Sequence, residues 1–300
     1  MLVLSCAEQP RGRWRAPNWP FKPMYDKLET HDEVELSGIE LNAVKPVNLK
    51  DTFSFTSHIS VYENCAVQYK YFKELGFEQK RIGATLFGTL VHETIEDIHK
   101  AALRHEEDLI DADNVRIWLD TNYTTLSKKE HSYLGQKQID AAYKQVLRYV
   151  QKNGKDWSRI QEAEAEVSLV KPEYILKGQI DLIRGKGDTV ELIDFKSEKK
   201  PDDKIKNDLF ERYRRQLEVY SYLVEEKIGK KVSKMHLYYT GDESKDPLVT
   251  FEKSKESVDK TIHEFDEVVE HIQAKDFNHK AKDKKLCENC DMRFFCRTNR

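Results

Sequence analysis

The sequence predicts an α/β fold in which helices flank a central sheet, and three observations support this prediction. Apolar residues recur at helical spacing between residues 84 and 103, and they form one stripe of Phe87, Val91, Ile95, Ile98 and Ala102. Three segments between residues 165 and 196 are rich in apolar and β-branched residues and are separated by turn residues. Beyond residue 205, helical, strand-like and helical patterns alternate.

The first half of the chain is predicted to be mostly helical. Residues 1–50 contain five of the eight prolines and are expected to be an irregular lead-in or connector. Ser57 is a candidate cap for a helix that continues through Cys65 and Tyr69. A second helix is expected over 84–103, and residues 105–160 continue in helical style, as a helical insertion. Residues 51–300 are expected to form the main domain.

The second half is predicted to hold the sheet. Strands are expected over 165–170, 175–184 and 189–196, and the last two are joined by a hairpin turn, Gly185-Lys186-Gly187-Asp188. A long helix over 205–228, a strand over 234–239 and a helix over 254–273 follow, before a cysteine-rich tail.

Composition restricts the function classes. Charged residues make up 34% of the 300 residues and the net charge is −3, so any attraction to nucleic acid must come from local basic patches. No apolar run of about 18 residues is present, which argues against a membrane span. Five cysteines, an odd number, without a secretory signal argue against a disulfide scaffold and favour a cytoplasmic location.

Asp194, Phe195 and Lys196 end the last strand of the hairpin. Residues two apart on a strand share a face, so Asp194 and Lys196 are expected to project together. Hairpin pairing is expected to bring Asp181, from the preceding strand, beside Asp194. Two neighbouring carboxylates favour a shared divalent cation, and a nearby ammonium favours phosphate chemistry.

Two helices add candidate side chains. In the first, His92 and Glu96 lie one turn apart on a polar face that is expected to include His99. A zinc protease is disfavoured because Glu96 stands where that signature needs a second histidine. The later helix places Gln216 and Tyr220 on one face, directly after a basic run that is expected to contact nucleic-acid phosphates through Arg212, Arg214 and Arg215.

In this order the motifs resemble the RecB-like branch of the PD-(D/E)xK nucleases, including AddB and the RecB-like nucleases of CRISPR systems, over residues 54–300. The matching motifs are Gly88-x-x-x-His92, Gly178-x-x-Asp181, Asp194-x-Lys196 and Gln216-x-x-x-Tyr220. The resemblance implies a restriction-endonuclease-like core with a mixed central sheet. It also implies a catalytic lysine, Lys196, site-positioning roles for Gln216 and Tyr220, an acidic position at Glu166, and a metal held by His92, Asp181, Asp194 and the Phe195 carbonyl. An imidazole among carboxylates favours Mn²⁺ as this metal, with Mg²⁺ as the alternative.

The cysteines form a second motif. Cys287, Cys290 and Cys296 give a C-x2-C-x5-C spacing, and a tetrahedral or cubane centre needs a fourth thiolate, for which Cys65 is the candidate. These ligands leave zinc and iron-sulfur both open. The resemblance to AddB-like and CRISPR-associated nucleases implies a 4Fe-4S cluster that joins the N- and C-terminal parts, with structural Zn²⁺ as the alternative. Cys6 is unassigned.

The sequence thus predicts a metal-dependent DNA nuclease, an exonuclease on single-stranded or helicase-unwound DNA, in repair, recombination or defence. The alternative is a catalytically silent iron-sulfur DNA-binding module. The opening residues 1–5 resemble the last core strand of a UvrD-like helicase motor, which suggests a helicase domain or subunit as partner. No Gly-Lys-Ser/Thr phosphate loop is present, so ATP hydrolysis by this chain is not expected.

Overall fold

A computed structural model describes residues 50–78, 83–201, 207–281 and 284–296 of the protein. All of them belong to the second of two units, residues 1–49 and 50–300. The predictions for the lead-in, for its first five residues and for Cys6 concern residues outside the described part of the chain.

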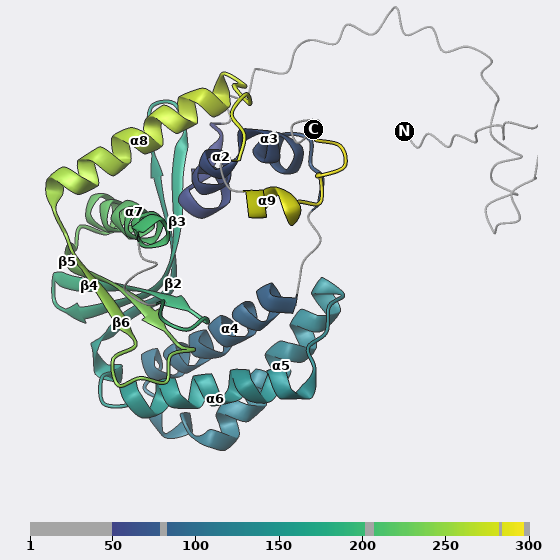
Figure 1. Ribbon diagram of the computed structural model, residues 1–300. Coiled ribbons are helices and arrows are strands. Elements are labelled where there is room, and N and C mark those ends of the chain that lie inside the picture. Colours follow the sequence, from purple (N-terminus) through teal and green to yellow (C-terminus); the bar gives the residue numbers. More distant parts are fainter. Residues whose placement is uncertain (1–49, 79–82, 202–206, 282–283, 297–300) are drawn as a thin grey trace, which may run out of the picture. The chain divides into compact units, whose positions relative to one another are not determined.

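The described unit is built on a six-stranded mixed sheet (Figure 1). Its strands are β1 (Thr52–Ser54), β2 (Ile160–Val170), β3 (Ile175–Lys186), β4 (Thr189–Lys196), β5 (Lys231–Tyr239) and β6 (Leu248–Glu252). The order is β1-β3-β4-β5-β6, with β2 also paired to β3; β1 with β3 and β4 with β5 are parallel, and the other pairs are antiparallel. The predicted mixed sheet is confirmed, although the short strands β1 and β6 were not predicted.

Strands β3 and β4 separate at one end, and this fork positions the candidate site. Their pairing runs from the hairpin turn to Leu182 opposite Ile193. Beyond that pair, β4 remains paired with β5 as far as Lys196. The start of β3, residues 175–177, pairs instead with β1. Because β2 occupies the other edge of β3, the residue before Leu182 and the residue after Ile193, Asp181 and Asp194, border a gap in the sheet.

Helices cover both faces of the sheet (Figure 1). On one side lie α4 (Gly83–Leu103), α5 (Ala112–Glu130) and α6 (Gln136–Asn153), and on the other α7 (Asn207–Leu223) and α8 (Lys255–Gln273), while α2 (Ser60–Asn64), α3 (Ala66–Tyr69) and α9 (Lys284–Glu288) gather near one end. The last turn of the predicted 205–228 helix is a π-helix, Val224–Ile228. None of the helices in the described ranges is both long and apolar enough to cross a membrane.

Successive side chains of β4 point alternately into two hydrophobic cores. Val190 and Leu192 belong to the core under α7 and α8, whereas Ile193 and Phe195 belong to the core under α4–α6. This period of two is what an extended chain buried on both faces requires. Asp194 therefore faces α7, on the side opposite to Phe195.

The predicted continuous helix through Cys65 is wrong, because the chain breaks there. A π-helix, Phe55–Ile59, leads into α2, and Cys65 then adopts an extended backbone (φ −166°, ψ 107°) before α3 begins. The Cys65 Sγ accepts the Gln68 N–H at 3.4 Å, as the N-cap of α3. The break therefore places the sulfur at the N-terminus of α3.

Candidate active site and cysteine pocket

Asp181 and Asp194 lie side by side at the fork of β3 and β4. Asp194 is buried and the Asp181 side chain is 13% exposed, and the Phe195 N–H donates to Asp181 Oδ2 at 2.7 Å. Burial, followed by the charge of Asp194, raises the pKa of Asp181 to about 6. Holding two carboxylates this close costs stability, and a cation between them removes that cost.

Lys196 supplies a positive charge at the same place. Its ammonium forms an ion pair with Asp194 Oδ2 and lies 4.4 Å above the centre of the Tyr213 ring. Burial opposes the charge, but Asp194, with smaller contributions from Asp181 and Tyr213, outweighs burial and raises the pKa of Lys196. The lysine is therefore protonated at neutral pH and held in place from two sides.

Helix α7 fixes Asp194 from one face of the sheet. The buried Gln216 amide donates to Asp194 Oδ1 at 2.8 Å and contacts the Tyr220 hydroxyl at 3.0 Å. The helix can approach β3 this closely because Gly178 has no side chain. A Cβ there would lie 2.7 Å from Leu223 Cδ1 and 3.0 Å from the Tyr220 ring.

Helix α4 contributes His92 from the opposite face. The His92 Nδ1 lies 3.6 Å from Asp181 Oδ2, and a Cβ on Gly88 would lie 3.2 Å from the Ser197 hydroxyl, so the helix packs closely on the end of β4. The prediction that His99 shares the polar face is wrong. His99 is 1% exposed and hydrogen-bonded to the Tyr149 hydroxyl at 2.7 Å, because α6 covers that side of α4.

Glu164 is a site residue that the sequence analysis missed. It lies on β2, opposite Asp181 of β3, between the paired positions Ala163 and Ala165. Its backbone is left-handed (φ 49°), which is unusual for a non-glycine residue. Burial, followed by the charge of Asp181, raises its pKa to about 7. The Gln179 amide donates to Glu164 Oε2 at 2.7 Å.

The structure places the predicted acidic residue, Glu166, outside this group. Glu166 is exposed and forms an ion pair with Lys177 at 2.6 Å. The segment Glu162-Ala163-Glu164-Ala165-Glu166 offers acidic residues at every second position, so alternation alone does not select one. Only the register with β3 does so, because it sets Glu164 opposite Asp181 and Glu166 opposite Gln179.

These side chains line one cavity of about 460 Å³, here called the carboxylate pocket. Its lining comes from both helical layers and from β2, β3 and β4, and it comprises Thr56, Gly88, Thr89, His92, Glu93, Glu96, Glu164, Gln179, Asp181, Asp194, Gln216 and Tyr220. The structure therefore brings the predicted His92, Asp181, Asp194, Gln216 and Tyr220 together, with Lys196 paired to Asp194.

The four predicted cluster cysteines line a second cavity of about 140 Å³, here called the cysteine pocket. Cys65 enters from the start of α3, and Cys287, Cys290 and Cys296 come from the tail. Burial, followed by smaller effects that include the charges of Cys65 and Cys296, raises the pKa of the Cys290 thiol. Within the described residues, however, no group of three or more His, Cys, Asp or Glu side chains is arranged to hold a metal ion as it stands.

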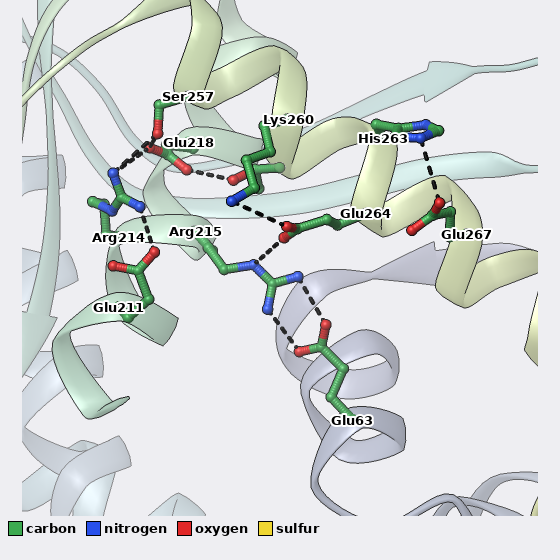
Figure 2. Close-up of polar contacts among 11 residues, drawn as sticks. Glu63, Glu211, Arg214, Arg215, Glu218, Ser257, Lys260, His263, Glu264 and Glu267 are labelled. Carbon is green, nitrogen blue, oxygen red and sulfur yellow. Dashed lines mark hydrogen bonds and ion pairs between the residues drawn. The ribbon is translucent and has the colours of Figure 1, made fainter. Parts of the chain in front are cut away.

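Two of the three arginines predicted to contact nucleic acid are engaged within the protein. Arg214 bonds to Glu211 and Ser257, and Arg215 forms a two-pronged pair with Glu63 (Figure 2). The Arg215 side chain is only 15% exposed, whereas Arg214 is half-buried. Arg212 is partly exposed, beside Tyr213.

Comparison with known proteins agrees with this geometry. Residues 52–297 match the model of the PD-(D/E)XK nuclease superfamily, and the chain belongs to that superfamily. The crystal structure of a "putative exonuclease" from Eubacterium rectale superposes with a TM-score of 0.54 at 15% identity, over 88% of this chain and 94% of that one. The crystal structure of SSO0001 gives a TM-score of 0.35 at 13% identity, over 77% and 94% of the two chains, which is too low to support an argument. A search of curated proteins found no match.

Proposed function

We propose that the protein is a divalent-metal-dependent deoxyribonuclease that hydrolyses phosphodiester bonds, acting as an exonuclease on single-stranded or helicase-unwound DNA. The observation that carries the proposal is the placement of the buried Asp194 beside the largely buried Asp181, with the Lys196 ammonium against Asp194. A fold gains nothing from two adjacent buried carboxylates, whereas a nuclease needs them. The exonuclease assignment also draws on the name of the E. rectale protein.

The donors at the fork suit Mn²⁺ or Mg²⁺. His92, Asp181, Asp194 and the Phe195 carbonyl would hold the ion, and the repulsion from Asp194, which together with burial raises the pKa of Asp181, supports a cation between the two carboxylates. A bound ion would polarise the scissile phosphate and acidify a water molecule. Lys196 would stabilise negative charge on the phosphate and orient the attacking water.

Three further side chains support these groups. Gln216 holds Asp194 Oδ1, and Tyr220 is held by the same amide, so both orient the site and the substrate strand from α7. Glu164, in place of Glu166, takes the additional acidic role, as a ligand to metal-bound water or to the ion itself.

The cysteine pocket would hold a 4Fe-4S cluster, with structural Zn²⁺ as the alternative. Four cysteines converge on one cavity, and the Cys65 Sγ accepts the Gln68 N–H. A centre here would join segments that lie 222 residues apart, from Cys65 to Cys287, and would disfavour the unfolded chain.

The biological setting is part of the same proposal. The expected substrate is DNA, the expected partner is a UvrD-like helicase domain or subunit, and the expected roles are repair, recombination or defence. The helicase assignment rests on the sequence of residues 1–50 alone. Arg212 remains the proposed phosphate contact on α7.

The test is cleavage of 5′- and 3′-labelled single- and double-stranded DNA by anaerobically purified protein with Mg²⁺ or Mn²⁺. Lys196→Ala should lower the cleavage rate by about 10²–10³-fold, the usual cost of losing one charge-stabilising group. The control is Lys177→Ala, which removes an exposed lysine that pairs with Glu166 outside the pocket. It should cut at the wild-type rate.

The outcomes separate the two functions. Metal-dependent cutting that is lost only in Lys196→Ala supports the nuclease, and the label pattern gives its polarity. Metal-loaded wild type that binds DNA but cuts none of the substrates would instead support the silent DNA-binding module.

A further inference from the structure

Two consecutive residues of α7 connect the two pockets. Gln216 points to the carboxylate pocket, where its amide holds Asp194. Arg215, the residue before it, points to α2 and α8 (Figure 2). A shift of this turn of α7 therefore moves the support of Asp194.

Arg215 is held firmly at its outer end. Its two terminal nitrogens contact the two Glu63 carboxylate oxygens at 2.9 and 2.8 Å, and its Nε lies 3.3 Å from Glu264 (Figure 2). The guanidinium also stacks over the Phe55 ring, 5.4 Å from its centre, and the side chain is only 15% exposed. A planar fork on a carboxylate is a geometry that arginine forms and lysine does not.

Glu63 belongs to the segment that carries Cys65. Only Asn64 lies between them, and α2 ends at that residue. The preceding residue, Tyr62, is tied to the chain that leads into the tail, because its hydroxyl donates to the Asp276 carbonyl at 2.5 Å and its own carbonyl contacts His279 at 2.6 Å. Segments from both ends of the described unit therefore meet beside Glu63.

We propose that Arg215 is a positioning residue that couples occupancy of the cysteine pocket to divalent-metal affinity in the carboxylate pocket, through its pair with Glu63. The inference rests on the proposed function for the identity of both sites. Metal on the cysteines fixes Cys65 and hence α2; the Glu63 pair transmits that position to α7, and Gln216 transmits it to Asp194. When the cysteines are empty, α2 is less constrained and the support of Asp194 is weaker.

The neighbouring Arg214 provides a matched control. It is an arginine on the same turn of α7 and is also held by acidic and hydroxyl groups, but its partners are Glu211 on its own helix, Glu218 and Ser257. None of these lies on the segment that carries Cys65. A general loss of helix stability should affect both arginine variants, whereas loss of the proposed coupling should affect only one.

The experiment measures Mn²⁺ affinity by titration of the full-length protein, following the free ion by electron paramagnetic resonance. Each protein is measured with its cysteine-bound metal and after that metal has been stripped, with metal content checked by mass spectrometry. In wild type and in Arg214→Lys, stripping should weaken Mn²⁺ binding at least about fivefold, the lower end of typical coupling between sites. In Arg215→Lys, affinity should already be weak before stripping, and stripping should change it less than about twofold.

A second variant protects the test against misfolding. Glu63→Gln breaks the same pair from the other side and should give the same loss of coupling, so that one folded variant suffices. The proposal is overturned if Arg215→Lys or Glu63→Gln keeps the wild-type response to stripping, or if wild type shows no response or carries no metal on its cysteines. Wild type that couples the two sites but cuts no DNA would refute the proposed function and leave the coupling intact.

Discussion

The carboxylate pocket takes its side chains from strands and long helices that pack on both faces of the sheet, whereas the cysteine pocket takes its own from short helices and turns near the two ends of the described chain. In the carboxylate pocket, two hydrophobic cores fix the scaffold, and the adjacent carboxylates on it reduce the stability of the metal-free protein. In the cysteine pocket, Cys65 is buried beside core residues, but the three tail cysteines are only partly buried, so the proposed metal would have to supply their order. The difference predicts that changes in the first pocket mainly affect activity, and changes in the second mainly affect stability.

The largest expected effect is on activity, from Asp181→Asn. Cleavage should fall about 10³-fold, equivalent to about 4 kcal/mol, because a proposed metal ligand is lost. The metal-free protein should melt at an equal or higher temperature, since the repulsion with Asp194 disappears while the amide oxygen can still accept the Phe195 N–H. Thermal melts in the absence of divalent ions measure this, and a clear fall in melting temperature would contradict the comparison.

Cys290→Ser should behave in the opposite manner. Losing a centre that closes a loop of this length should lower the free energy of unfolding by on the order of 3–5 kcal/mol, by analogy with a long-loop disulfide. Urea denaturation of metal-loaded wild type and variant tests this, with Asp181→Asn as the control that keeps all four cysteines. Equal unfolding midpoints for Cys290→Ser and wild type would show that the cysteine pocket has no structural role.

Glu164→Gln sharpens the description of the carboxylate pocket. We expect cleavage to fall by up to about 100-fold, the range for groups that support a metal site. Glu166→Gln, two residues along the same strand, should leave cleavage unchanged because Glu166 is exposed and paired with Lys177. A larger effect from Glu166→Gln would restore the assignment made from the sequence.

The smallest effect concerns the pH dependence of stability near the carboxylate pocket. Burial lowers the pKa of His99 to about 3, so the unfolded chain binds this proton more readily than the folded one. Stability from the neutral ring is therefore complete above the unfolded value of 6.5 and is lost as the pH falls towards 3. Between pH 7.5 and 5, wild type should lose about 2 kcal/mol more than His99→Gln. Denaturation at both pH values measures the difference, and parallel losses would argue against a neutral buried His99.

The sequence was sufficient for residues whose position follows from local geometry. Asp194 and Lys196 lie two apart on a strand, and the short turn at Gly187 sets the register that brings Asp181 opposite. The sequence was insufficient where distant partners decide. Arg215 belongs to a basic run, but its environment is set by Glu63, 152 residues away. Likewise, the paired register of β2 with β3, and not the pattern of β2, selects Glu164.

The contacts of Tyr62 with Asp276 and His279 join residues 214 and 217 positions apart. Because a ribosome synthesises the chain from the N-terminus, all six strands emerge before the tail that carries three of the four pocket cysteines. The sheet and its carboxylates can therefore assemble before the three tail cysteines that share the pocket with Cys65 have been synthesised. During that interval the nascent protein would have the proposed active-site residues in place without the centre proposed to support them, so we expect the carboxylate pocket to reach its full divalent-metal affinity only after the tail has been synthesised and the metal inserted.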